Sequence, residues 1–179
     1  MSARPRVSHE GREYEWNGRQ WFDVKSGEIP PVSVAVTLNG RIAETLAASD
    51  AAITNFGELL DRARGAREAK QWRRAEHLAR QALVLRPGDP GALASLCAAL
   101  RALSRPEIAL AESAKPSGKP TAALLTTRAA AMCDLGMWPE AKREVGRALA
   151  MGTSGEAYNV VHRIKSARPE LYEKPDSDE

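Results

Sequence analysis

The sequence predicts an all-α fold of stacked helical hairpins, preceded by a small β-hairpin. The first observation is an internal repeat, because two stretches carry the same residue types 66 residues apart. The second is composition: 43% of the 179 residues are hydrophobic but only 5% are aromatic, and much of the apolar share is alanine, which favours close-packed helices. The third is a series of breaks rich in proline and glycine, which divides the helical patterns into short segments.

The repeated positions hold large apolar, small and aromatic residues in a fixed order. Six residues of the first copy recur in the second: Leu59, Ala63, Trp72, Ala75, Ala82 and Leu83 become Leu125, Ala129, Trp138, Ala141, Ala148 and Leu149. The block between the copies supplies Leu93, Cys97 and Ala109 at the same phase, so the period is 32 to 34 residues. Such a period is typical of helical hairpins that stack into an array, bury a spine of side chains and leave a long open surface.

The N-terminal segment predicts a β-hairpin. Residues 1–11 are polar and are expected to be loose. Apolar and polar residues then alternate up to Asn17-Gly18, a pair that favours a type I′ turn, so we expect strands at 12–16 and 19–23. Because a lone hairpin is marginal in water, its aromatic rings are expected to lie against a neighbour, for which the helical domain is the obvious candidate.

Residues 32–48 have two readings. Val32, Val34, Val36 and Leu38 alternate with polar or small residues as in a strand, and Asn39-Gly40 could turn a second hairpin. A spacing of four residues, from Val34 through Leu38 onward, instead indicates one face of a helix. The alanines at 43–48 favour the helix, and Pro31 suits a first helical position, so we expect a helix over 32–48.

Three helical pairs and a last helix are expected after residue 55. Ser49 or Asp50 is the candidate N-cap of the first of them. Segments 86–90 and 115–120, both rich in proline and glycine, separate the pairs. The expected helices are 56–69 with 72–85, 91–103 with 106–115, 121–135 with 138–151, and a last helix at 155–167.

This pattern resembles the tetratricopeptide-repeat (TPR) family over about residues 56–151. Each unit of that family has a large and then a small residue in its first helix, an aromatic and two alanines in its second, and a closing proline. The first unit here has Leu59, Ala63, Trp72, Ala75, Ala82 and Pro87, the third has the same order with Thr153 in place of proline, and the second departs after Ala109. The resemblance implies a right-handed superhelix of about three units plus a capping helix.

The expected organisation therefore has four segments. Residues 1–31 form an N-terminal aromatic β-hairpin module, and residues 32–55 form a connecting helix. Residues 56–167 form the TPR-like helical repeat domain, and residues 168–179 form an acidic, fraying tail.

The sequence contains no pattern that indicates catalysis or a metal site. His9, His77 and His162 lie in different segments, without acidic residues or cysteines at ligand spacing. No serine or cysteine stands with a histidine and an acid as a nucleophile would require. Cys97 and Cys133 are each alone in an apolar helical pattern, which indicates small core residues. We therefore expect a protein that is not an enzyme, with no cofactor and no bound metal.

In TPR arrays the first helix of each pair lines a concave groove, and the resemblance carries this surface over to the present chain. By helical phase, the outward positions on these helices are Leu60, Arg64, Arg67, Ser95, Ala98, Arg101, Thr126, Thr127 and Ala130. We predict that seven of them form the partner-binding groove, namely Leu60, Arg64, Arg67, Ser95, Arg101, Thr126 and Thr127. Because guanidinium groups hold carboxylates in a fork, Arg64, Arg67 and Arg101 favour an acidic peptide or a free C-terminus. The alternative is that these arginines only solvate the helix face.

A second candidate surface is aromatic and lies in the N-terminal hairpin. Its members are Tyr14, Trp16, Trp21 and Phe22. These rings could form a miniature core that docks on a neighbour or could contact a second partner. Trp16 and Trp21, beside Arg12 and Arg19, could also stack on single-stranded bases.

Charge and the missing catalytic patterns lead to three functional hypotheses. The net charge is +3, and residues 56–88 alone carry eight basic and four acidic groups. The leading hypothesis is a non-enzymatic adaptor or scaffold that binds a protein or peptide. The alternatives are a basic nucleic-acid-associated protein and a module that associates with itself. Met1–Val7 shows no secretory signal and no apolar run is long enough for a membrane span, so the expected location is the cytoplasm.

Overall fold

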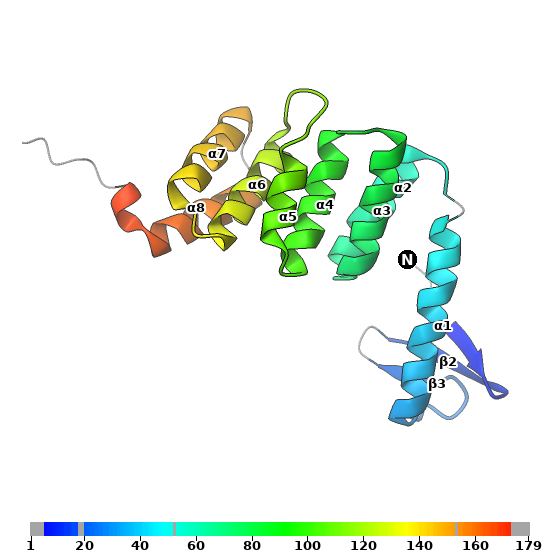
Figure 1. Cartoon of the computed structure of the whole chain (residues 1–179). Coiled ribbons are helices and arrows are strands. Elements are labelled where there is room, and N and C mark those ends of the chain that lie inside the picture. Colours follow the sequence, from blue (N-terminus) through cyan, green and yellow to red (C-terminus); the bar gives the residue numbers. More distant parts are fainter. Residues whose placement is uncertain (1–5, 18–19, 52, 153, 173–179) are drawn as a thin grey trace, which may run out of the picture. The chain divides into compact units, whose positions relative to one another are not determined.

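The computed structural model describes residues 6–17, 20–51, 53–152 and 154–172. Its chain divides into two compact units, Met1–Ile53 and Thr54–Glu179. Unit 1 contains a small β-sheet and one long helix, whereas unit 2 contains the helical pairs (Figure 1). The predicted fold class is confirmed, with one strand more in unit 1 than a hairpin would have.

Unit 1 has a three-stranded antiparallel sheet in the order β1-β2-β3. The strands are β1 (Arg6–His9), β2 (Arg12–Trp16) and β3 (Trp21–Asp23). The expectation of a loose segment over residues 1–11 is wrong for β1, which pairs with β2 from Arg6 opposite Glu15 to His9 opposite Arg12. Two residues with positive φ, Glu10 at 50° and Gly11 at 76°, close this hairpin as a type I′ turn requires.

The connection between β2 and β3 is longer than the two-residue turn that Asn17-Gly18 predicts. Trp16 lies opposite Trp21, so four residues connect the strands. Two bonds close the loop: the Asn17 backbone N–H donates to the Gln20 carbonyl at 3.2 Å, and the Gln20 N–H donates to Asn17 Oδ1 at 3.0 Å. The conformation of Gly18 and Arg19 lies outside the described residues.

Residues Val32–Ala51 form helix α1, which confirms the helical reading of this segment and extends it by one turn. Pro31 precedes the first turn and accepts a hydrogen bond from the Ala35 N–H at 3.0 Å. Leu38 of α1 packs with Tyr14 and Trp21 of the sheet in a core that also includes part of Val7, Trp16, Val34, Ala35 and Ile42. The helix is therefore part of the same unit as the strands, because its apolar face covers their aromatic side chains.

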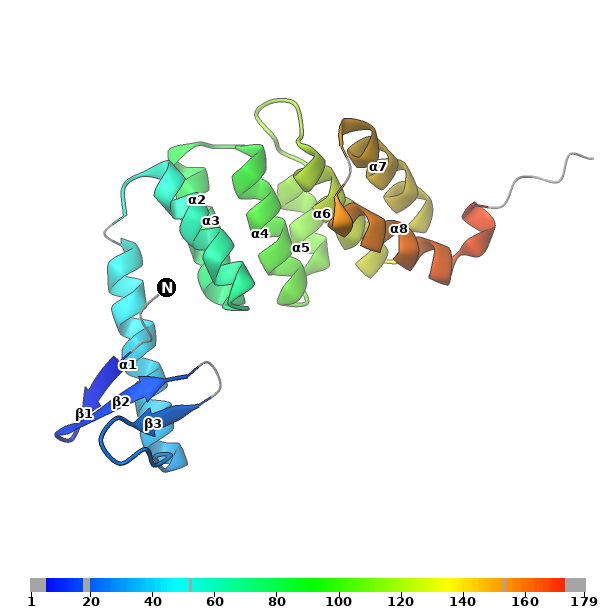
Figure 2. The same cartoon turned by 180° about the vertical axis from the view of Figure 1, so that it is seen from behind.

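Unit 2 contains seven α-helices in its described part, and their bounds lie within three residues of the expected ones. They are α2 (Phe56–Glu68), α3 (Trp72–Leu85), α4 (Pro90–Ala102), α5 (Pro106–Ser113), α6 (Ala122–Asp134), α7 (Trp138–Met151) and α8 (Gly155–Ala167). Neighbouring helices pack side by side in chain order, as Figures 1 and 2 show. First helices of successive pairs also pack on each other, since α4 contacts both α2 and α6, and α6 contacts α8.

Side chains that cap the helices explain where most of them begin. The expected cap at Ser49 or Asp50 is wrong, because α1 continues to Ala51 and Asn55 caps α2 by accepting from the Glu58 N–H at 3.2 Å. Asp89 caps α4 by accepting from two backbone N–H groups, each at 2.9 Å. Thr121 and Ser154 cap α6 and α8 in the same way. Each cap satisfies donors that a helix leaves free in its first turn.

The repeated alanines lie in the core of unit 2. Ala63, Ala75, Ala82, Ala129, Ala141 and Ala148 are fully buried, as are Ala109 and Cys97 of the middle pair. A larger side chain at such a helix crossing would push the backbones apart and cost about 1–3 kcal/mol. The period in the sequence thus corresponds to the positions where helices approach most closely.

The segment after α8 departs from the expected tail. Pro169–Leu171 forms a short 3₁₀ helix, and Leu171 and Tyr172 pack against the core of α6, α7 and α8. Lys142 of α7 donates to the Leu171 carbonyl and lies over the Tyr172 ring. Residues 173–179 lie outside the described part of the chain.

Both cysteines are free and buried. Burial raises the pKa of the Cys97 thiol from 9.0 to about 11, so the thiolate is scarce near neutral pH. The raised pKa also means that this thiol's contribution to stability is complete below pH 9.0 and is lost as the pH rises through about 11.

We expect Cys97 in the native protein to react with a thiol reagent at mildly alkaline pH at least about a hundredfold more slowly than in denaturant, because the pKa difference lowers the thiolate fraction by that factor. Mass spectrometry of alkylated peptides over time measures both rates. Native labelling of Cys97 at the denatured rate would contradict the buried placement of this thiol.

Candidate partner-binding groove

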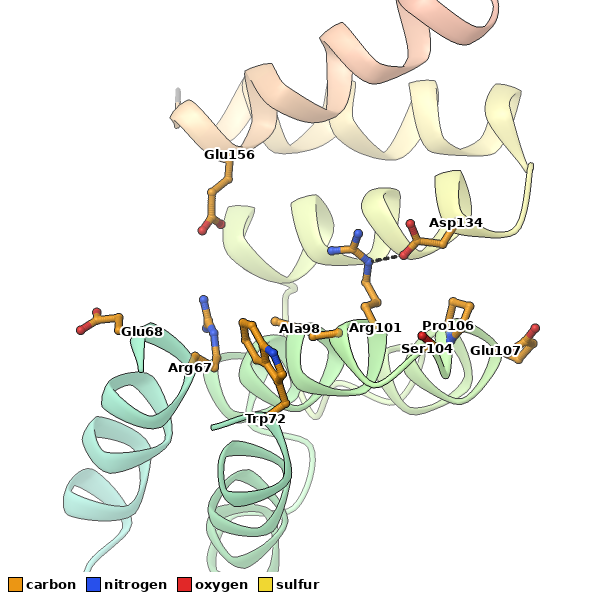
Figure 3. Close-up of a pocket in the computed structure, with 11 residues that line it drawn as sticks. Arg67, Glu68, Trp72, Ala98, Arg101, Ser104, Pro106, Glu107, Asp134 and Glu156 are labelled. Atoms are coloured by element: carbon orange, nitrogen blue, oxygen red, sulfur yellow. Dashed lines mark hydrogen bonds and ion pairs between the residues drawn. The ribbon is translucent and has the colours of Figure 1, made fainter. Parts of the chain in front are cut away.

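Two adjoining hollows in unit 2 form a groove along the first helices of the pairs. One has a volume of about 820 Å³ and is drawn in Figure 3; the other has a volume of about 350 Å³. They share four lining residues, Arg67 of α2, Ala98 and Arg101 of α4, and Glu156 of α8. We call this combined surface the groove.

Small side chains leave the groove open in the middle. Its lining on α4 and α6 includes Ala94, Ala98, Ala123, Thr126, Thr127 and Ala130. Alanine at four of these positions and threonine at the other two keep the side chains short, and alanine also favours the helix. Longer charged side chains from α2, α4 and α8 surround the middle of the groove. Figure 3 shows Arg67, Arg101 and Glu156 extending into the space between these helices.

One carboxylate connects three of the groove-lining helices. Asp134, at the end of α6, accepts from Arg101 Nε of α4 at 2.7 Å and from Arg163 Nη1 of α8 at 2.6 Å. Burial by itself would raise the pKa of Asp134, but the hydrogen bonds from the two guanidinium groups outweigh it and lower the pKa. The carboxylate is therefore ionised at neutral pH, and it occupies one donor group of each arginine.

Arg67 differs from the other two arginines of the groove. It lines both hollows and is half-buried, yet within the described ranges no acidic side chain forms an ion pair with it. Figure 3 shows it extending from the end of α2 beside Trp72. Arg67 is thus a cation of the groove whose guanidinium is available to a ligand.

The structure brings together four of the seven predicted groove residues. Arg67, Arg101, Thr126 and Thr127 line the smaller hollow. The predicted basic strip is nevertheless interrupted, because Arg101 is paired with Asp134 and Arg64 is outside both linings.

Arg64, Leu60 and Ser95 lie elsewhere. Arg64 is exposed and pairs with Asp61 of its own helix at 3.4 Å. Leu60 lies beside Gly91 at the start of α4, and Ser95 is only 5% exposed in the core. Helical phase predicted from sequence was too coarse on α2 and α4 to separate the groove from the contacts between neighbouring first helices.

Sequence reasoning missed the acidic half of the groove. Glu68, Arg101 and Asp134 all line the larger hollow, and they stand 33 residues apart in the chain. These three residues occupy the same position in successive repeat units, and their charges alternate from negative to positive to negative. The spacing could therefore have predicted that Arg101 pairs with Asp134. Glu156, Asn159 and Arg163 were missed because α8 was read only as a solvating cap.

The four aromatic residues of the N-terminal surface divide into two groups. Tyr14 and Trp21 belong to the core of unit 1, and Trp21 is only 2% exposed. Its indole N–H donates to Asn39 Oδ1 of α1 at 2.8 Å. Trp16 and Phe22 are half-buried, and the Trp16 ring lies 5.6 Å from that of Trp21. The neighbour that covers Tyr14 and Trp21 is therefore α1, and Trp21 has no free face on which a base could stack.

The described residues offer binding surfaces and no arrangement for metal chemistry. Within them, no three His, Cys, Asp or Glu side chains converge on a point where a metal ion could bind. None of the helices in the same ranges combines the length and hydropathy that a bilayer crossing requires. His77, on α3, is exposed.

Comparison with known proteins identifies the architecture of unit 2. No protein-family model matches the chain, and no curated protein matches its sequence. Solved structures that are similar to this chain include three TPR domains. The Sgt2 TPR domain from Aspergillus fumigatus has a TM-score of 0.58 at 21% identity, over 71% of this chain and 89% of that one. The first TPR domain of human RPAP3 has a TM-score of 0.54 at 18% identity, over 64% and 92%. The Arabidopsis OM64 TPR domain has a TM-score of 0.56 at 19% identity, over 63% and 95%.

Proposed function

Because unit 2 has the tetratricopeptide-repeat fold, we propose that this chain is a protein-binding adaptor. It holds a segment of a partner protein in the groove. The observation that carries the proposal is the continuity of the two hollows across α2, α4 and α8, with α6 between them. A groove of this kind, with short side chains in its middle and charges at its margins, can accept an extended or helical segment by shape and a few polar contacts. Stacked helical pairs in general present such extended surfaces.

Charge narrows the kind of partner segment. Arg67 is open, so an acidic side chain of the partner would gain a fork-shaped, charge-assisted contact there. Glu156 lines both hollows and is available for a basic or hydroxyl-bearing side chain. Because Arg101 and Arg163 are already paired with Asp134, we propose a partner segment with one acidic residue at Arg67 and mixed polarity elsewhere, rather than a uniformly acidic one.

The experiment that tests this proposal compares two arginines of the same helix. Arg67→Glu is expected to weaken partner binding about tenfold or more, because it puts a carboxylate where the partner's acidic residue binds. Arg64→Glu is the matched control, since Arg64 lies one turn earlier on α2 and outside the groove, and it is expected to leave binding within about twofold. Partners captured from the native host by the wild-type chain provide the binding assay, by calorimetry or surface plasmon resonance.

Site-specific photocrosslinking tests where on unit 2 the partner binds. A photoreactive residue at Thr127 lies in the groove, and one at the exposed Arg143 of α7 lies outside it. We expect the captured partner to crosslink at position 127 and not at position 143. Equal crosslinking at both, or unchanged binding by Arg67→Glu, would count against the groove as the binding surface.

A further inference from the structure

Apart from the two hollows of the groove, unit 2 has a further hollow that is lined by basic residues and shares no lining residue with the groove. It has a volume of about 510 Å³ and lies between α3 and the turn that connects α4 to α5. Its lining consists of Arg73, Glu76, His77, Arg80, Leu103 and Arg105. Three arginines against one glutamate leave a net charge of +2 in this hollow, without counting His77. We call it the α3 pocket.

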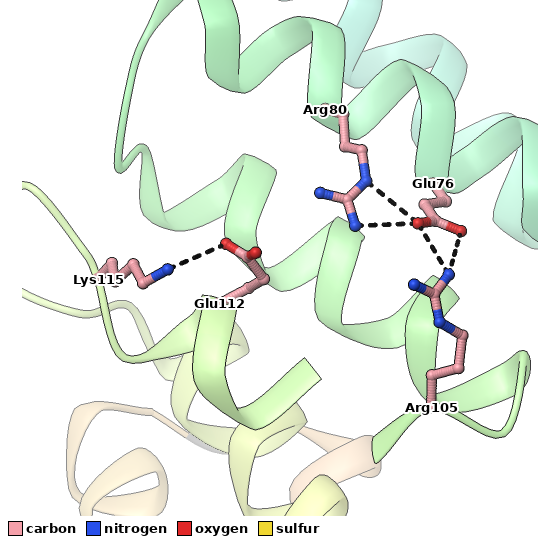
Figure 4. A network of polar contacts seen from close by, with 5 residues as sticks. All are labelled: Glu76, Arg80, Arg105, Glu112 and Lys115. Carbon is pink, nitrogen blue, oxygen red and sulfur yellow. Dashed lines mark hydrogen bonds and ion pairs between the residues drawn. The ribbon is translucent and has the colours of Figure 1, made fainter. Parts of the chain in front are cut away.

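One partly buried carboxylate fixes two of the three guanidinium groups in the α3 pocket. Glu76 is 16% exposed at its side chain. It accepts from Arg80 Nε at 3.1 Å and Nη2 at 3.0 Å, and from Arg105 Nη1 at 3.2 and 3.3 Å. Figure 4 shows the two guanidinium groups on Glu76, that of Arg80 from the same helix, α3, and that of Arg105 from the turn before α5. They are thereby held close together, although their charges repel.

Several donors of the pocket remain unused. A guanidinium has five N–H donors, and Glu76 occupies only Nε and Nη2 of Arg80 and Nη1 of Arg105. Arg73, two helical turns before Arg80 on α3, has no acidic partner among the residues that the structure describes. The pocket therefore has both excess positive charge and free N–H donors. An anion with several acceptor oxygens would balance the charge and accept from these donors.

The repeat framework does not explain this cluster. The residues 66 positions further along from Arg73, Glu76 and Arg80 are Pro139, Lys142 and Gly146. The helix of the third pair is equally well formed without them. The cluster is therefore not a requirement of helix stacking, in contrast to the buried alanines.

We propose that the α3 pocket binds a phosphomonoester dianion. A phosphomonoester carries about −1.5 to −2 charges at neutral pH and three strongly accepting oxygens, which matches the net +2 of the pocket and its three guanidinium groups. Arginine is suited to this role because its planar fork binds phosphate oxygens in pairs. The three guanidinium groups surround one hollow, which favours a single phosphate group over a nucleic-acid backbone, because a backbone needs cations spread along a track.

The test uses the full chain and defined probes. Backbone and arginine Nε resonances are followed by NMR during titration with inorganic phosphate, O-phospho-L-serine, a phosphoserine peptide and a single-stranded oligonucleotide. Serine, which lacks the phosphate, is the control. We expect saturable shifts at Arg73, Arg80 and Leu103 with the phosphomonoesters and none with serine. Tighter binding of the phosphopeptide would assign a protein source of the phosphate, and equal affinities would assign a free small molecule.

Two variants separate a built pocket from general charge attraction. Arg73→Ala is expected to weaken phosphoserine binding about tenfold, without loss of fold because Arg73 is exposed. Arg143→Ala, which removes an exposed arginine from α7, is the control and is expected to have no effect. Equal losses in both variants, an absence of saturable shifts, or much tighter binding of the oligonucleotide through Arg73 would each overturn the proposal. Arg67→Glu leaves phosphate binding unchanged if the pocket and the groove are separate.

Discussion

Replacing Trp21 by alanine is expected to unfold unit 1 while the helical repeats of unit 2 stay folded. Trp21, Tyr14 and Leu38 are the buried residues of the unit 1 core. Loss of a buried tryptophan costs about 3–5 kcal/mol, and a unit of this size has a total stability of only a few kcal/mol. The variant also loses the hydrogen bond from the indole N–H to Asn39.

Hydrogen exchange with mass spectrometry resolves the two units in one experiment. Peptides from residues 6–51 of Trp21→Ala should lose protection, whereas peptides from residues 56–167 should keep it. Phe22→Ala is the matched control, because Phe22 is the next residue of β3, is half-buried and is outside the core. We expect Phe22→Ala to lower the stability of unit 1 by less than half as much as Trp21→Ala does. Parallel loss of protection in both units would show that they do not fold independently.

The second large effect is expected at Gly88, in the turn between α3 and α4. Gly88 has a φ of +75°, and a Cβ built on it would lie 2.6 Å from the backbone nitrogen of Ser117. The Ser117 N–H donates to the Gly88 carbonyl at 2.9 Å, so this contact attaches the α5–α6 loop to the turn. Gly88→Ala combines a left-handed backbone cost of about 1–2 kcal/mol with a steric clash against main chain. We therefore expect unit 2 to lose about 2–4 kcal/mol.

Gly118 provides a close control for Gly88. It belongs to the same attached loop, but its φ is not in the left-handed region and a Cβ there would meet no atom within 4 Å. Gly118→Ala should leave the stability unchanged or raise it slightly, because alanine restricts the unfolded chain. Urea unfolding followed by circular dichroism measures both variants. If Gly88→Ala matched Gly118→Ala, the close contact with Ser117 would not exist in solution.

The helical part of the fold could be predicted because its signals are local and repeated. Each pair has its own breakers and its own alanines at fixed spacing, so every helix was found within three residues. Strand β1 was missed because Arg6–His9 contains one apolar residue, Val7, and its strand character depends on pairing with β2. Such pairing is a property of the sheet and leaves little trace in four residues of sequence.

The groove could be predicted in location but only in part in its chemistry. Helical phase placed Arg67 and Arg101 on the open face of first helices near their C-terminal ends, and both line the hollows. It could not show that Arg101 is neutralised, because its partner Asp134 is one repeat away in the chain. The pocket at α3 was hidden for a similar reason, since Arg105 comes from a turn between helices and meets Glu76 only in the folded state.

The shared carboxylate of Asp134 also links Arg101 of α4 to Arg163 of α8. Each of its two oxygens is engaged by an arginine from a different helix. A ligand that attracts Arg101 leaves Asp134 to Arg163 alone, and a ligand that attracts Arg163 does the reverse. We therefore expect a ligand that pairs with Arg101 to change how Arg163 is held, although no helix has to move.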